Sequence, residues 1–159
     1  MSIKKTILAL VIFLLTTSCG FKVLNYNELT NFRITQIKSE GDKTINYKIK
    51  NKLKTYNSDG GKNKTEIGIE IISEKRRSIK EKNSSNEITK YQIDIIIKIK
   101  TTSKNENFVK EFEINKAAEY SVKKNHSKTL NNQKKILDLL TESLGEEIIN
   151  KLILEFNDL

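Results

Sequence analysis

The stretch YQIDIIIKIK, residues 91–100, decides the fold of this chain. Its apolar side chains recur at every second position, and most of the residues between them are polar, with Ile96 as the exception. The apolar set is Tyr91, Ile93, Ile95, Ile97 and Ile99, and the polar set is Gln92, Asp94, Lys98 and Lys100. Successive side chains of a strand point to opposite faces, so this period predicts a strand with one apolar and one polar face. Such a strand needs a helix to cover its apolar face.

Two more stretches with the same period lie on either side of this central strand. The earlier one carries Ile67, Ile69 and Ile71, and the later one carries Phe108, Phe112 and Ile114. Polar residues at 80–86 and 102–107 separate the stretches and have the length of hairpin connections. The three strands are therefore predicted to form an antiparallel meander. If the earlier strand continues through Arg76 to Ile79, its hairpin is long.

Two helices are predicted from apolar residues spaced four apart. The first has Ile45, Ile49 and Leu53 on one stripe, with Asp42 as its N-cap, and the turn-rich residues 57–64 end it. The second is the C-terminal segment, with Thr129 or Asn131 as its cap and Gly145 inside it. Its stripe consists of Ile136, Leu140, Leu144, Ile148 and Leu152.

A short alternating segment at 31–36, with Phe32 and Ile34 on one side, adds a fourth strand ahead of the first helix. The predicted fold is α+β, in the order strand-helix-strand-strand-strand-helix. It is a two-layer sandwich in which a four-stranded, mostly antiparallel sheet carries two helices packed on one face. Residues 31–159 are predicted to form a single domain, because a chain of this length has one sizeable core.

The N-terminal residues have the order of an export signal. Lys4 and Lys5 precede an uncharged apolar run at 7–15, and Thr16-Thr17-Ser18-Cys19-Gly20 follows. The run is shorter than the roughly 17 to 25 residues of a transmembrane helix. Cys19 is the chain's one cysteine, and a cut after Ser18 would make it the first residue of the mature protein.

A cysteine at that position is a site for lipid attachment, and two or three acyl chains hold a protein stably on a membrane. We therefore expect a lipoprotein signal peptide at 1–18 and a lipidated tether at 19–30. Because Gly20, not Asp, follows the cysteine, we expect the periplasmic side of the outer membrane as the location. Thr16 stands where Leu is usual, so a plain signal peptide with an incidental cysteine is the alternative.

The chain is basic, with a formal net charge of +9, or +7 without Lys4 and Lys5. A positive surface favours anionic partners, while export excludes nucleic acid. The sequence is also rich in Ile, Lys and Asn and has no proline, which an AT-rich genome would explain equally well.

Motifs for chemistry are scarce, and neither an enzyme nor a cofactor is predicted. His126, the one histidine, lies in a polar stretch without further metal ligands and is expected to be a solvated loop residue. Asp94 with Glu111 or Glu113 would form a carboxylate pair, but on the polar face of strands their ordinary role is pairing with lysines. No glycine-rich phosphate loop is present.

The remaining signal is a basic cluster of Lys75, Arg76 and Arg77, with Lys80 and Lys82 close by. Arginine binds a phosphate through two parallel hydrogen bonds, so the cluster is a candidate site for an anionic ligand. The alternative is a charged hairpin that protects a sheet edge from aggregation. Lys98 and Lys100 of the central strand are further candidates.

Several of these features together resemble the LPS-assembly lipoprotein family, LptE. They are Cys19-Gly20-Phe21-Lys22 after the signal, the order of elements, Ala117-Ala118-Glu119-Tyr120 leaving the last strand, and the long terminal helix. The resemblance implies a non-enzymatic plug inside the outer-membrane β-barrel LptD that helps to insert lipopolysaccharide. No local motif identifies the contact residues, so Arg76 and Arg77 are candidates from charge alone. The alternative is a free-standing, periplasm-facing lipoprotein that binds a small anionic or lipid ligand.

Overall fold

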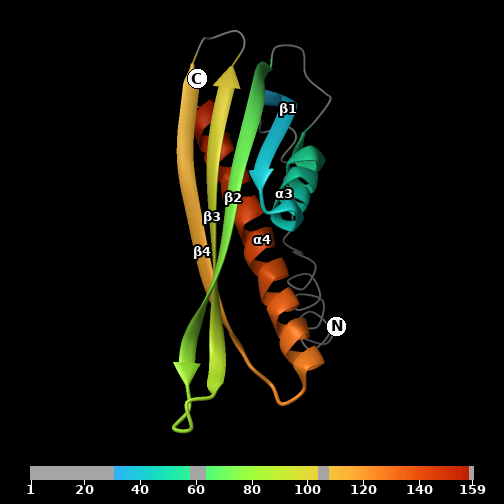
Figure 1. Ribbon diagram of the computed structural model, residues 1–159. Coiled ribbons are helices and arrows are strands. Elements are labelled where there is room, and N and C mark those ends of the chain that lie inside the picture. Colours follow the sequence, from blue (N-terminus) through green and yellow to red (C-terminus); the bar gives the residue numbers. More distant parts are fainter. Residues whose placement is uncertain (1–30, 58–63, 104–107, 158–159) are drawn as a thin grey trace, which may run out of the picture.

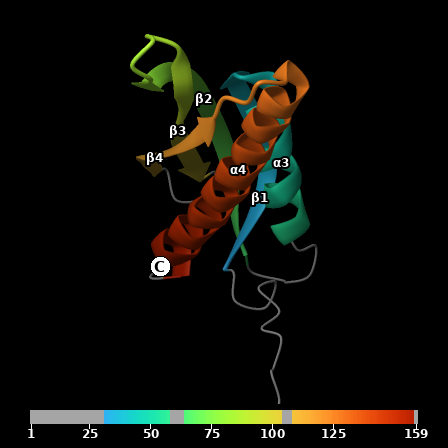
Figure 2. The ribbon, with the colours of Figure 1, turned by 90° about the horizontal axis from the view of Figure 1, so that it is seen from below.

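A four-stranded sheet with two helices on one face makes up the computed structural model, which describes residues 31–57, 64–103 and 108–157 (Figure 1). The order of elements confirms the predicted fold class. In chain order they are β1 (Phe32–Gly41), α3 (Lys43–Tyr56), β2 (Thr65–Lys82), β3 (Ile88–Ser103), β4 (Val109–Ser121) and α4 (His126–Asn157). Seen from below, α4 crosses the sheet at an angle and α3 lies beside it, next to β1 (Figure 2).

The strands lie side by side in the order β1-β2-β3-β4. The pairs β2–β3 and β3–β4 are antiparallel, as the meander prediction required. β1 and β2 are parallel, because α3 carries the chain back before β2 begins. Their pairing ends at Gly41 and Ser73, so β2 continues to Lys82 with β3 as its only partner.

The core lies between the sheet and the helices. The four isoleucines predicted to face inward in the central strand, Ile93, Ile95, Ile97 and Ile99, are each at most 1% exposed. From the other layer, Ile45, Ile49 and Leu53 of α3 are equally buried. α4 adds Leu140, Leu144, Ile148, Ile149, Leu152 and Phe156. Gly145 lies where α4 approaches α3, and a Cβ there would come within 3.0 Å of Lys52 Cδ.

The link between β1 and α3 is built on Gly41 and Asp42. Gly41 has a φ of +99°, and a Cβ at this position would lie 1.9 Å from the carbonyl oxygen of Ser73, so only glycine fits. Asp42 is the predicted N-cap: its carboxylate accepts hydrogen bonds from the backbone N–H groups of Thr44 and Ile45, at 3.0 and 3.1 Å. The turn therefore fixes where α3 begins.

Three boundaries differ from the prediction. β1 extends to Gly41, β2 takes in residues 80–82 and β3 takes in Thr102 and Ser103, which leaves a turn at Asn83–Glu87 between β2 and β3. Asn83 closes that turn, since its side chain accepts hydrogen bonds from the N–H groups of Ser85 and Glu87. Polar side chains do not end a strand when they face solvent on both sides. The segment Ala117–Tyr120 also lies inside β4, which ends one residue later.

The start of α4 was also predicted wrongly. The helix begins at His126, and Asn125 caps it by accepting a hydrogen bond from the N–H of Ser127 at 2.8 Å. Thr129 lies within the helix and binds back to Lys123. His126 is exposed as expected, but in the first turn of a helix and not in a loop. Within the described ranges, no helix has both the length and the apolar character needed to cross a bilayer.

Candidate anion-binding surfaces

The basic cluster of β2 does not form one surface, because its residues lie in a strand. Arg76 pairs with Asp94 across to β3, on the face of the sheet away from the helices, here called the outer face. Lys75 and Arg77 pair with Ile95 and Ile93, whose side chains face the helices. Adjacent arginines therefore point to opposite faces. The structure places Lys98 and Lys100 with Arg76 on the outer face, and it separates these three from Lys75 and Arg77.

On the helix face, Lys75 is bound to Asp42, with 2.5 Å between Nζ and Oδ2. Burial alone would raise the pKa of Asp42, but the hydrogen bonds from Lys75 and from the backbone of Ile45 and Thr44, together with the lysine charge, lower that pKa overall. Arg77 has a different neighbour: its guanidinium carbon lies 4.7 Å from the centre of the Tyr91 ring. Among the ion pairs of the described residues, none involves Arg77.

On the outer face, each basic candidate has a carboxylate partner. Arg76 Nε lies 2.6 Å from Glu74 Oε1, and this hydrogen bond lowers the pKa of Glu74. Lys100 Nζ lies 2.9 Å from Glu111 Oε1, and the hydrogen bond between them raises the pKa of Lys100. Lys98 Nζ lies 3.8 Å from Glu113 Oε2. Glu111 and Glu113 thus have the cross-strand role expected from the sequence. An anionic ligand on this face would have to displace carboxylates.

A hollow of about 510 Å³ lies among these pairs on the outer face. Ile72, which is 44% exposed, contributes an apolar surface. Around it stand two lysines and three glutamates, so the formal charge of the lining is −1, not positive. The charged residues are Glu70, Lys98, Lys100, Glu111 and Glu113.

The structure reveals a basic surface that the sequence analysis did not identify. On α3, Lys43, Tyr47, Lys50 and Lys54 follow one another at intervals of four, three and four residues, which places them on one side of the helix. We call these four residues the lysine stripe. They lie opposite the buried stripe of Ile45, Ile49 and Leu53, and Tyr47 is 67% exposed.

The positive charges of the lysine stripe are not balanced by ion pairs with the other described residues. α3 contains five lysines and no carboxylate. Lys48 and Lys52 are bound to α4, the first to Asp138 and the second to Glu146 at 3.0 Å. None of the three lysines of the stripe takes part in an ion pair within the part of the chain that the structure describes.

A second uncompensated basic surface lies at the other end of the molecule, where α4 begins. It consists of the exposed residues Lys123, Lys124, Lys128, Lys134 and Lys135, which we call the α4-start lysines. No metal site is found in the described ranges, where no three His, Cys, Asp or Glu side chains gather. Cys19 and the predicted signal lie outside the described residues.

Comparisons with known proteins place the fold among bacterial lipoproteins. No protein-family model and no curated protein matches the sequence. Solved structures do match the fold, among them the following three, and at their low identities the likeness shows the fold alone. An uncharacterized lipoprotein B from Nitrosomonas europaea has a TM-score of 0.57 at 13% identity, covering 74% of this chain and 80% of its own. A minor lipoprotein from Acinetobacter baumannii scores 0.55 at 12% identity, covering 78% and 92%. A lipoprotein from Caulobacter crescentus scores 0.54 at 7% identity, covering 83% and 95%.

Proposed function

We propose that this protein is a non-enzymatic outer-membrane lipoprotein that partners the β-barrel LptD in the transport and insertion of lipopolysaccharide. The observation that carries the proposal is a fold shared with bacterial lipoproteins, in a chain whose first 18 residues have the order of an export signal and are followed by Cys19. The residues Cys19-Gly20-Phe21-Lys22 and the order of elements add the resemblance to the LptE family.

The outer face of the sheet suits contact with the polar interior of a barrel. Lys100–Glu111, Lys98–Glu113 and Arg76–Glu74 form ion pairs on this face, and the side chains of all three pairs are exposed. The lumen of an outer-membrane barrel is lined by polar residues, which can exchange partners with such pairs. Exposed ion pairs contribute only about 0 to 1 kcal/mol each, so this exchange costs little.

Of the five candidate contacts for lipopolysaccharide, Arg77 is the best placed. Lys75, Arg76, Lys98 and Lys100 would each have to release a carboxylate before binding a phosphate. Arg77 lies over the Tyr91 ring and takes part in no ion pair with the other described residues, so its guanidinium donors remain available. An arginine stacked on an aromatic ring is oriented for phosphate binding without losing its charge.

The second candidate function is a free-standing lipoprotein that binds a small anionic or lipid ligand. The hollow on the outer face favours it, because a volume of about 510 Å³ lies within the range of small-molecule sites. Lys98 and Lys100 stand at its rim, but a ligand would also have to offset its three glutamates.

A pull-down from outer membranes, with the N-terminal anchor intact, separates the two functions. We expect a large β-barrel to co-purify with the wild-type protein in detergent. Charge reversal at Lys98 and Lys100 alters the outer face and should reduce the yield of barrel. The same reversal at Lys134 and Lys135 provides a control with the same change in net charge. Recovery of a monomer without a barrel would contradict the proposal and favour the second function.

A further inference from the structure

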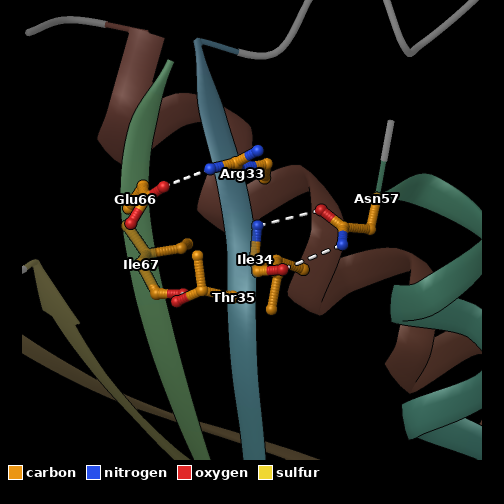
Figure 3. Close-up of polar contacts among 6 residues, drawn as sticks. All are labelled: Arg33, Ile34, Thr35, Asn57, Glu66 and Ile67. Carbon is orange, nitrogen blue, oxygen red and sulfur yellow. Dashed lines mark hydrogen bonds and ion pairs between the residues drawn. The ribbon is translucent and has the colours of Figure 1, made fainter. Parts of the chain in front are cut away.

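The chain enters the folded domain beside the end of α3. Ile34 of β1 and Asn57, directly after α3, are joined by two hydrogen bonds of 2.9 and 2.8 Å (Figure 3). The entry point therefore lies at the C-terminal end of the helix that carries the lysine stripe. α3 has 14 residues, so the whole stripe lies within about 21 Å of that point.

The length of the N-terminal segment restricts which surface faces the membrane. Residues 19–30 separate Cys19 from the domain, and twelve residues reach at most about 40 Å. Three of the α4-start lysines, Lys123, Lys124 and Lys128, are farther from the entry point than that. Phe32 at the entry touches Phe156, with ring centroids 5.4 Å apart, and His126 lies thirty residues earlier on α4, or about 45 Å away. If the start of α4 lay on the bilayer, with the helix upright, residues 19–30 would be too short to connect the anchor to the domain. If α3 lies on the bilayer, the entry point is close to the membrane and a short tether is enough.

The chemistry of the lysine stripe matches an anionic lipid surface. Lysines attract the phosphates of acidic headgroups while their alkyl stems lie along the apolar boundary. Tyr47, exposed between Lys43 and Lys50, has the amphipathic ring that favours a membrane interface. The exposed side of α3 has no carboxylate to repel the headgroups.

We propose that the lysine stripe of α3 docks the lipid-anchored domain onto the anionic phospholipid surface of the membrane that holds its anchor. The inference rests on the acylation of Cys19 in the proposed function but does not require the barrel. Each lysine near an acidic bilayer favours binding about fivefold, so three lysines favour the docked orientation on the order of a hundredfold.

The first test is lysine labelling on vesicles. The purified full-length lipoprotein is placed on vesicles of phosphatidylcholine alone, or of phosphatidylcholine and phosphatidylglycerol in equal amounts, and its lysines are acylated and quantified by mass spectrometry. On the anionic vesicles we expect labelling of Lys43, Lys50 and Lys54 to fall at least tenfold, with recovery in high salt. Labelling of Lys123, Lys124 and Lys128 should be unchanged. Equal labelling of the lysine stripe on both vesicles would overturn the proposal, as would protection of the α4-start lysines instead.

A second measurement uses charge-reversed variants. A polarity-sensitive dye on Asn51→Cys, an exposed position beside the lysine stripe, should shift to shorter wavelength on anionic vesicles. Reversal of Lys43, Lys50 and Lys54 to Glu should abolish the shift, while the same reversal at Lys123, Lys124 and Lys128 should preserve it. An equal dye shift in both variants would refute docking through α3. In the labelling experiment, protection of the lysine stripe that appears only when a barrel is added would also overturn the proposal and would assign the stripe to a protein interface. Flotation with both kinds of vesicle measures membrane attachment through the lipid anchor, which does not depend on the docking of α3.

Discussion

The side chain of Asn57 is hydrogen-bonded to both backbone groups of Ile34. Its Nδ2 donates to the Ile34 carbonyl at 2.8 Å, and its Oδ1 accepts from the Ile34 N–H at 2.9 Å (Figure 3). β1 lies at the edge of the described sheet, and these two groups have no strand of that sheet to pair with on this side. Asn57 supplies that pairing and joins the end of α3 to the start of the sheet.

Replacing Asn57 with Ala should destabilise the domain. The partly buried N–H and C=O of Ile34 would lose their partners, and an unsatisfied buried group costs about 1 to 3 kcal/mol. Asn51→Ala, at an exposed position within α3, should change stability by no more than about 0.5 kcal/mol. Urea unfolding of the two variants tests this. Equal midpoints would contradict the role assigned to Asn57.

The pair formed by Asp42 and Lys75 should make stability depend on pH. The pKa of Asp42 is lowered in the folded state from its ordinary 3.8, so its contribution is full above about pH 4 and is lost as pH falls through the lowered value. Asp42→Asn keeps a good N-cap but removes the charge that binds Lys75. The variant should be less stable at neutral pH by about 1 kcal/mol. The difference should shrink as the pH falls below about 4 and through the lowered pKa of Asp42, and a difference that stays constant with falling pH would argue against this assignment.

Ile95→Asp tests which face of β3 is buried. Ile95 is fully buried, and a carboxylate there would cost several kcal/mol, against a total stability of about 5 to 15 kcal/mol. Ile96 is the matched control, because its side chain lies on the outer face and is half-buried. Thermal melting should show loss of the cooperative transition for Ile95→Asp and a small shift for Ile96→Asp. The reverse order would mean that the face assignment is wrong.

The two arginines of β2 should differ in lipopolysaccharide binding. Arg77→Glu removes a guanidinium that has no ion-pair partner among the described residues, and it should weaken binding about tenfold, since a hydrogen bond to a charged group contributes about 1.5 to 3 kcal/mol. Arg76→Glu removes one already bound to Glu74 and should have a smaller effect. Reversal of both should weaken binding most, and wild-type binding should fall as salt rises. Equal binding by all forms would indicate a solvated strand edge and direct attention to Lys98 and Lys100.

The sequence predicted the fold because apolar and polar residues alternate sharply in residues 91–100. The same contrast is absent from Glu74–Lys82, where all side chains are exposed, so nothing in that segment distinguishes a strand from a loop. The separation of Arg76 from Arg77 therefore became visible only when β2 was seen to continue past Ser73. The sequence therefore identified the basic candidate residues by their charge but could not assign each of them to one face of the sheet.

Two other features were hidden for different reasons. Several residues near the start of α4 are of types that cap a helix, and Asn125, not the later Thr129 or Asn131, takes that role. The lysine stripe is readable as a spacing along 43–54, but lysine is so frequent in this chain that the spacing did not stand out. Its significance comes from ion pairs, since Lys48 and Lys52 are bound to α4 and the lysines of the stripe are not.

Both the proposed function and the proposed membrane docking depend on Cys19, so the mass of the mature N-terminus is the most direct test of the account. Mass spectrometry of the protein isolated from membranes should find Cys19 as the first residue, carrying two or three acyl chains. Cys19→Ser should leave the protein uncleaved or release it from the membrane. A wild-type protein with a free thiol at Cys19 would contradict the account.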